Sequence, residues 1–172
     1  MSYKILSVEA QNFLDLCAIK NYLRISHDYD DLWITELIGA SISAAESFLR
    51  KKLLKSKVQV KVKYSYMPNI RMPIGPVAEI LEVKAISGIY TITLLADEYI
   101  WEDEVIKLRN LPLYDHLVIE YIAGYPDQSQ IPASIKQGML LHIAEMYDSR
   151  GMVASISREV QKLYQLHRKM ML

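Results

Sequence analysis

The residues that could bind a metal ion are concentrated in one acidic segment, His27-Asp28-Tyr29-Asp30-Asp31. A calcium loop that opened at Asp28 would need a glycine at its sixth position and a carboxylate at its twelfth. The chain has Trp33 and Gly39 at those positions, so both requirements fail. We therefore expect this segment to be a solvated link that caps the helix after it.

The other residues with reactive side chains also favour structural roles. The four histidines have no spacing typical of metal ligands, and they are His27, His116, His142 and His167. His142 falls on an apolar helical face, which predicts a hydrogen-bonded core histidine. The single cysteine, Cys17, excludes an internal disulfide and is predicted to be a small buried side chain. The acidic residues from Asp97 to Glu104 lie in short-strand and turn sequence, which favours a solvated rim over paired catalytic carboxylates.

Composition narrows the possible functions further. The 172 residues contain no nucleophile elbow, phosphate-binding glycine loop or zinc-type Cys/His pair. We therefore predict no catalytic residue, no cofactor site, no metal site and no enzymatic activity. The 20 basic and 20 acidic residues cancel, which argues against a free-standing DNA-binding module. No apolar run reaches the length of a membrane span, so we expect a soluble protein that is made inside the cell.

Helical spacing of apolar residues predicts four helices. The first is expected from a cap at Asn12 to Ile25, and the second spans 31–52. Its small residues Ala44 and Ala45 would allow another helix to approach closely. The third helix, 132–150, has apolar residues on two faces and is predicted to be the central helix.

Two glycines and one serine add detail to the third and fourth helices. Gly138, inside the third helix, suggests that a neighbouring backbone passes close to it. Gly151 is expected to end this helix as a left-handed residue. Ser157 is expected to cap a last, basic and apolar helix that runs to the C-terminus.

Between these helices the pattern changes to strands. Val58, Val60 and Val62 alternate with polar residues, and the alternation continues to Tyr64 and Tyr66. Further short strands are expected at 80–86, 89–95, 99–101, 105–108 and 117–125, with a Ser87-Gly88 turn. Alternation of apolar and polar residues, which leaves one face of the sheet exposed to solvent, implies antiparallel strands. The predicted class is therefore α+β: a discontinuous helical domain from residues 1–56 and 126–172, with an inserted antiparallel β region, 57–125.

Several motifs resemble the head-tail connector family of tailed phages and gene transfer agents. One runs from Tyr121-x-Ala-Gly-Tyr125 through Ile131-Pro132-x-x-Ile135-Lys136-Gln137 to Tyr147 and Arg150. A second runs from Ile19 to Glu46 across the first two helices, and a third is Pro73-Ile74-Gly75-Pro76-Val77. Their order along nearly the whole chain makes the set more specific than any one motif.

The resemblance implies a non-enzymatic adaptor that docks on the portal protein and forms a ring of about twelve subunits. Such a ring would extend the DNA channel, let DNA pass without sequence-specific binding, and offer a platform to the next connector or tail-completion protein. The implied location is the virion, at the head-tail interface, after assembly in the host cytoplasm. The alternative is a DNA-packaging factor, a small terminase-like DNA binder, which the basic residues Lys57, Lys61 and Lys63 and the basic tail would serve.

The last helix is the candidate docking element, because the first three helices could complete a core without it. The predicted portal-docking residues are Val160, Leu163, Tyr164, His167, Arg168, Met170 and Met171. The alternative is that this segment is a fourth core helix.

Overall fold

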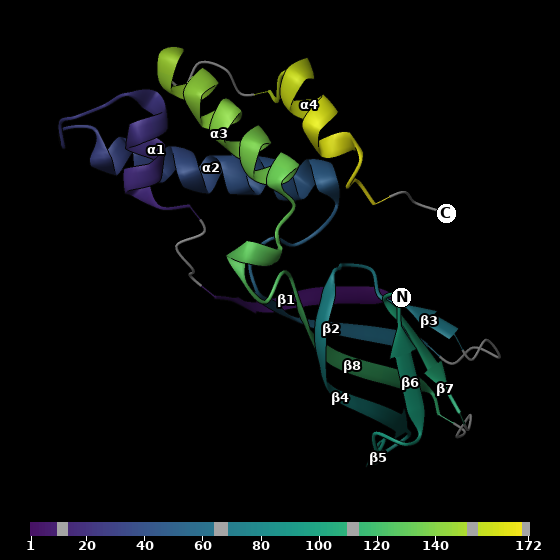
Figure 1. Cartoon of the computed structure of the whole chain (residues 1–172). Coiled ribbons are helices and arrows are strands. Elements are labelled where there is room, and N and C mark those ends of the chain that lie inside the picture. The colour runs from purple at the N-terminus through teal and green to yellow at the C-terminus, as the bar shows by residue number, and fades with distance from the viewer. Residues whose placement is uncertain (10–13, 64–68, 110–113, 151–154, 170–172) are drawn as a thin grey trace. The chain divides into compact units, whose positions relative to one another are not determined.

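The computed structural model describes residues 1–9, 14–63, 69–109, 114–150 and 155–169, and the chain divides into two compact units (Figure 1). The sheet unit is Met1–Ala10 with Leu54–Pro126, and the helical unit is Gln11–Leu53 with Asp127–Leu172. The described residues form four α-helices and two antiparallel sheets, which confirms the α+β class. Residues 1–10, which the sequence pattern placed with the helices, belong to the sheet unit, because Ser2–Val8 pair with a strand that is distant in sequence.

The described part of the helical unit forms four α-helices and one 3-10 turn. They are α1 (Leu16–Leu23), α2 (Asp31–Leu49), η1 (Gln128–Gln130), α3 (Ala133–Asp148) and α4 (Arg158–Gln165). Asp15 caps α1 by accepting a hydrogen bond from the Cys17 backbone N–H at 3.3 Å. The expected cap, Asn12, lies outside the described residues. Ser157 caps α4, as predicted, by accepting from the Val160 N–H at 3.3 Å.

Helix α2 packs against α3 through small residues. Ala45 is fully buried, and the Ser41 hydroxyl donates to the Met139 carbonyl oxygen on α3 at 3.3 Å. Part of the helical core is a cluster formed by Ile19, Ile34, Leu37, Ile143 and Met146. Cys17 is exposed, so the prediction of a buried cysteine was wrong. Ile19, two residues later, is the residue that α1 buries completely.

Gly138 permits a close approach, but its neighbour is a side chain rather than the backbone we expected. A Cβ atom at Gly138 would lie 2.4 Å from the Cε1 atom of Tyr164 on α4. The ring therefore lies directly over this turn of α3. Helix α3 ends at Asp148 with Ser149 as its C-cap, and Arg150 takes the left-handed conformation, with φ 51°, that we expected of Gly151. Gly151 lies outside the described residues.

Eight strands are formed by the residues of the sheet unit that the structure describes. They are β1 (Ser2–Val8), β2 (Ser56–Lys63), β3 (Asn69–Arg71), β4 (Val77–Ser87), β5 (Tyr90–Thr93), β6 (Tyr99–Glu102), β7 (Val105–Leu108) and β8 (His116–Ala123). The larger sheet has the order β1-β2-β8-β4-β5, and the smaller has the order β3-β7-β6. All pairings are antiparallel.

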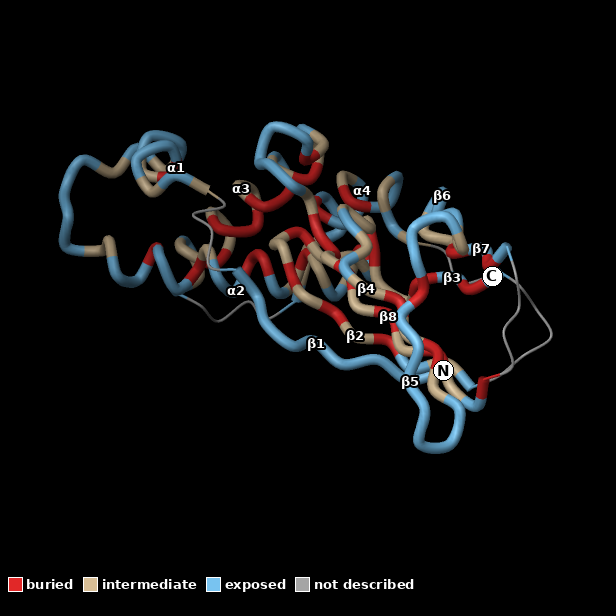
Figure 2. The backbone as a smooth tube through the Cα atoms, turned by 90° about the horizontal axis from the view of Figure 1, so that it is seen from below, coloured by how far each residue is buried: buried red, intermediate tan, exposed pale blue. Residues whose placement is uncertain are grey.

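The core of the sheet unit contains residues of both sheets (Figure 2). On β2, Val58 and Val60 are buried while Lys61 and Lys63 are exposed, so the predicted alternation is confirmed. Val58 is paired with Tyr121 and Val60 with Ile119 on β8, and all four side chains are fully buried. Tyr64 and Tyr66 lie outside the described residues.

Two glycines allow the sheet unit to turn. Gly88, with φ 58°, follows Ser87 in the tight turn between β4 and β5. Gly124 has φ 112°, and a Cβ atom there would lie 2.3 Å from the Leu54 carbonyl oxygen. A side chain at Gly124 would therefore meet both backbone strain and a direct clash.

Helix α2 is long and apolar enough to cross a membrane by length and composition alone. The core helix of a soluble protein satisfies the same criteria. Ile34, Leu37 and Ala45 are buried in the helical unit, and α2 contacts α1, α3 and α4. Packing thus accounts for these buried residues, whereas Leu32 and Trp33 of the same helix are exposed.

Candidate functional site

The structure assigns two of the predicted docking residues to the helical core. Val160 and Tyr164 on α4 are both 0% exposed. The Tyr164 ring lies against Gly138 and has its centroid 5.9 Å from that of Phe48 on α2. These contacts match the alternative in which the segment is a fourth core helix. A partner could not reach Val160 or Tyr164 without opening this packing.

The other predicted docking residues are more accessible or lie beyond the described chain. Leu163 and His167 are half-buried and Arg168 is exposed. The His167 ring is held by a hydrogen bond between Nε2 and the Ser134 hydroxyl at 2.8 Å. The Arg168 guanidinium lies 4.9 Å from the centre of the Phe48 ring, a cation–π arrangement.

Met170 and Met171 lie outside the described residues. Sequence reasoning missed Leu166, which is 88% exposed directly after α4. The sequence feature that could have identified Leu166 is the position of this leucine outside the apolar stripe of the helix. Leu166 and Arg168 are therefore the accessible residues of the candidate docking surface, with Leu163 and His167 partly accessible beside them.

Two buried polar side chains define the chemistry inside the helical unit. Burial raises the pKa of the Tyr164 hydroxyl, and the Ser41 hydroxyl opposes that rise in part. His142 is only 2% exposed, so its predicted burial is confirmed. The predicted hydrogen bond is not formed, because neither ring nitrogen of His142 has a partner among the described residues. Burial lowers the pKa of His142, and the carboxylate of Glu145 acts in the opposite direction.

The carboxylates of the acidic segment before α2 contact a lysine and do not gather into a cluster suited to a metal. Lys20 Nζ contacts Asp28 and lies 2.7 Å from Asp31 Oδ1. Asp30 accepts a hydrogen bond from the Tyr147 hydroxyl at 2.6 Å. Within the described ranges no group of His, Cys, Asp or Glu residues could hold a metal ion. Asp30 holds the N-cap position of α2 without a side-chain cap hydrogen bond, so the predicted capping is not formed. The contacts of Lys20 and Tyr147 hold the segment instead.

The acidic rim between Asp97 and Glu104 is only partly solvated. Asp103 is exposed, whereas Glu104 is half-buried. The two residues form the β6–β7 turn, with φ 47° and 65°. Burial raises the pKa of Tyr125, and the Glu104 carboxylate adds to that rise. This segment thus has a structural role within the sheet unit.

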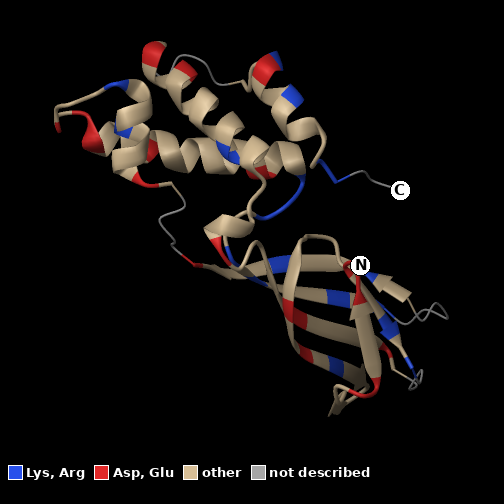
Figure 3. Cartoon of the chain, in the orientation of Figure 1, with Lys and Arg blue, Asp and Glu red and all other residues tan. Residues whose placement is uncertain are grey.

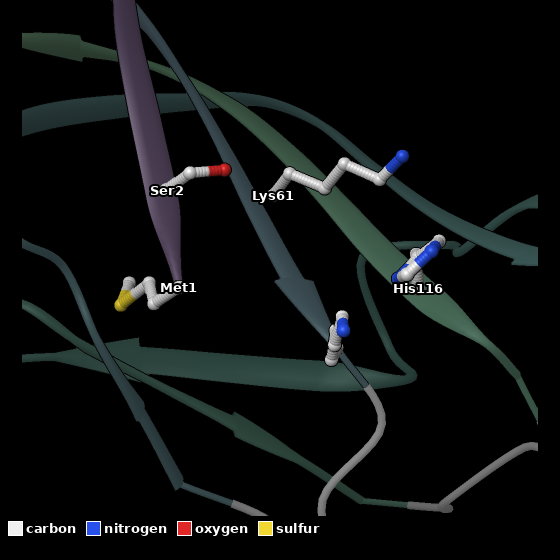
Figure 4. Close-up of a pocket in the computed structure, with 5 residues that line it drawn as sticks. Met1, Ser2, Lys61 and His116 are labelled. Carbon is white, nitrogen blue, oxygen red and sulfur yellow. The ribbon is translucent and has the colours of Figure 1, made fainter.

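The basic face of β2 is smaller than the sequence implied. Lys57 Nζ lies 2.8 Å from Glu120 Oε2, and this contact is the main cause of the lowered pKa of Glu120. Figure 3 shows that the strands of the sheet unit carry acidic as well as basic residues. Lys61 and Lys63 lie with Met1, Ser2 and His116 around an open cavity of about 390 Å³ (Figure 4). Proteins whose DNA binding depends strongly on salt make on the order of 6–10 phosphate contacts. Two exposed lysines can make far fewer, so we expect only a weak electrostatic attraction for DNA.

Most of the large exposed apolar residues of the sheet unit lie on or beside the edge strands β1 and β5, although Leu81 on β4 and Ile100 and Trp101 on β6 are also exposed. On β1 they are Tyr3, Ile5, Leu6 and Val8, and at β5 they are Ile89, Tyr90 and Ile92. Isolated exposed apolar residues are common, but exposed apolar strands at sheet edges mark interaction sites. Sequence reasoning missed this feature because the strand order was unknown.

No protein-family model matches the chain, and no curated protein matches it. Its fold is similar to a chain from the neck of an empty gene transfer agent particle computed with C6 symmetry. That match has a TM-score of 0.79 at 18% identity and covers 100% of this chain and 97% of that chain.

Two further solved structures have the same fold. A chain from the virion of a native gene transfer agent particle matches with a TM-score of 0.78 at 17% identity. A chain from the neck of the native particle, computed with C12 symmetry, matches with a TM-score of 0.78 at 19% identity. Each match covers 100% of this chain and 97% of the other. The chain therefore has, over its full length, the fold of chains found in gene transfer agent necks and virions.

Proposed function

We propose that this chain is a structural head-tail connector of a phage-like particle. The observation that supports the proposal most directly is the fold shared with neck chains over 100% of its length. The ordered connector motifs in the sequence support it independently of the fold. In this role the chain docks on the portal, forms a ring that extends the DNA channel, and presents a platform for tail attachment.

The C6 and C12 symmetries of the similar neck structures support ring formation by this chain. A head-to-tail ring needs two different surfaces on each subunit and closes only at a fixed rotation. A net charge of zero suits a channel wall along which DNA must slide without binding. No step of this function requires catalysis, a cofactor or a metal.

For portal docking we propose the accessible residues around the end of α4, above all Leu166 and Arg168. Leu166 offers an exposed apolar side chain, and Arg168 beside it can pair with an acidic group. Val160 and Tyr164 contribute by holding α4 in place rather than by direct contact. Met170 and Met171 lie outside the described residues and stay part of the predicted docking set, because their flexible thioether side chains can adapt to a partner surface.

The experiment measures co-sedimentation of the chain with portal-bearing heads from the particle that encodes it. The unmodified chain is expected to sediment with the heads, and Leu166→Glu is expected to reduce the bound amount at least tenfold. Leu32→Glu is the matched control, because Leu32 on α2 is exposed to a similar extent, 85% against 88%. Failure of the unmodified chain to sediment would overturn the connector proposal, whereas equal binding of both variants would move the docking surface away from α4.

The rival function is a DNA-packaging factor that binds duplex DNA. The ion pair of Lys57 with Glu120 counts against it, because it leaves two exposed lysines on that face of β2. Binding to duplex DNA at several salt concentrations separates the two functions. Tight binding at physiological salt with a steep salt dependence would favour the rival.

A further inference from the structure

Both edge strands of the five-stranded sheet present apolar side chains to solvent. On β1, Tyr3 is 54% and Ile5 is 41% exposed. On β5, Tyr90 is 72% and Ile92 is 62% exposed. Each strand also has one backbone edge with no partner strand among the described residues, because β1 and β5 end the sheet order (Figure 1). An open edge of this kind can pair with another strand.

The four side chains lie on one face of the sheet. Tyr3 and Ile5 are paired with the buried residues Val60 and Val58. Ile92 is paired with the buried Ala85, and Tyr90, two residues away, shares its face. These exposed side chains therefore continue the core face of the sheet beyond both of its ends.

Protection by proline or charge is weak on both edge strands, although the register of β1 with β2 shifts between Ile5 and Ser7. Natural edge strands are commonly blocked by prolines or charged side chains. Strand β5, Tyr90–Thr93, contains neither. Strand β1 contains a single charge, Lys4, which is paired with Gln59 and so lies on the opposite face from Tyr3 and Ile5. The core face of both edges is left apolar.

The strand order fixes how two copies can join at these edges. All four pairings within the five-stranded sheet are antiparallel, so its first and fifth strands, β1 and β5, run in the same direction. Neighbours in a ring of about twelve copies differ by a rotation of only about 30°. Strand directions are nearly preserved by so small a rotation. A β1 strand that meets β5 of the next copy must therefore lie parallel to it.

We propose that the partner of these edges is a second copy of this chain, with β1 of one subunit added in parallel to β5 of the next. The proposal rests on the ring of the proposed function and identifies its subunit interface. Parallel pairing places Tyr3 beside Tyr90 when Ile5 lies beside Ile92, because each pair of residues is separated by two positions. Aromatic meets aromatic and aliphatic meets aliphatic on the same face, an arrangement that stabilises cross-strand pairs.

The strand arrangement favours this pairing over a two-fold dimer. A two-fold axis would join β1 to β1 or β5 to β5, and both pairs would be antiparallel. Such contacts use one edge of each subunit and leave the other edge exposed. The head-to-tail arrangement covers both edges of every subunit in a closed ring.

The experiment introduces a disulfide across the proposed interface in purified particles. Neighbouring strands lie about 4.8 Å apart, which is within the Cα separation that a disulfide accepts. The background variant is Cys17→Ser, because the exposed Cys17 would otherwise form cross-links of its own. Ile5→Cys and Ile92→Cys are added together, and each is also made alone as a matched control. Oxidised particles are then analysed by denaturing gel electrophoresis without reductant.

The expected result is a ladder of cross-linked species from the double variant, lost on reduction and absent from both single variants. A dimer from either single variant would show pairing of identical edges and overturn the proposal. A cross-link to a different protein would assign the edge to another partner, and a double variant that enters particles without forming a ladder would exclude this register and interface.

These outcomes differ from failure of the connector function itself, which would appear as absence of the unmodified chain from purified particles. In that case the same oxidation is applied to the concentrated purified chain. A ladder would then support the proposed interface, and the absence of a ladder would overturn it. Tyr90→Lys, added to the double-cysteine variant, provides a second measurement, with an expected loss of the ladder and an unchanged thermal unfolding midpoint, because Tyr90 is exposed on the same face as position 92. If that variant fails to fold, the cross-linking result from the double-cysteine variant still decides the proposal.

Discussion

The contact between Gly138 and Tyr164 can be tested with a single methyl group. Gly138→Ala places a Cβ atom 2.4 Å from Tyr164 Cε1, whereas carbon atoms in ordinary contact are about 3.5–4.0 Å apart. The ring or the helix must therefore shift by about 1 Å. Overpacking of this kind costs about 1–3 kcal/mol of unfolding free energy. Replacing glycine with alanine inside a helix recovers about 1 kcal/mol.

Gly39→Ala is the matched control. Gly39 lies inside α2, and a Cβ atom there would have no neighbour within 4 Å. This variant should raise the unfolding free energy by about 1 kcal/mol, the full gain in helix propensity. Because both variants share that gain, the difference between them isolates the contact. We expect Gly138→Ala to be less stable than Gly39→Ala by about 1–3 kcal/mol.

The assay is urea unfolding followed by the fluorescence of Trp33, which lies in the helical unit. Trp101, in the sheet unit, is first replaced with phenylalanine so that Trp33 alone reports. Tyr164→Leu in combination with Gly138→Ala should recover part of the loss, since the ring that causes it is absent. Equal stabilisation by the two alanine variants would show that the Tyr164 ring does not pack against this turn of α3.

Two further predictions concern the helical unit. The pKa of His142 lies below its ordinary value of 6.5, so the unfolded state binds more protons below that pH. The unfolding free energy should therefore fall as the pH decreases below about 6.5, and it should fall less steeply in His142→Leu. Urea midpoints measured at pH 7.5 and 5.5 that shift equally in the two proteins would contradict this expectation. Ala45→Leu should cost about 1–3 kcal/mol because Ala45 is fully buried, whereas Ala40→Leu on the exposed side of α2 should change stability by less than about 0.5 kcal/mol. Matching thermal midpoints for these two leucine variants would disprove close packing at Ala45.

Local patterns predicted most of the elements. The strand expected at 105–108 has those bounds, α2 begins at Asp31 as expected, and Ser157 caps α4. These features depend on residues within a few positions of one another, such as a serine that accepts from an N–H three residues later. The short-range pattern was also sufficient for the buried alternation on β2.

Features that depend on distant residues were not predictable in the same way. The pattern of Tyr3–Val8 indicated an extended segment, but its partner β2 begins nearly fifty residues later. A glycine indicates that something is close without indicating what, so Gly138 could not reveal Tyr164. An amphipathic helix is consistent with both a docking element and a core helix. Only the packing of Val160 and Tyr164 against the other helices distinguishes them.

The chain passes between its two units three times, after Ala10, after Leu53 and after Pro126. During synthesis this connectivity delays folding of both units. When the first 53 residues have emerged, β1 has no strand to pair with, and α1 and α2 have neither α3 nor α4 to cover them. The sheet is completed by β8 and the helical core by α4, close to the end of translation. Apolar segments from two unfinished cores are thus exposed together on the nascent chain, a state in which chaperones would be expected to bind it.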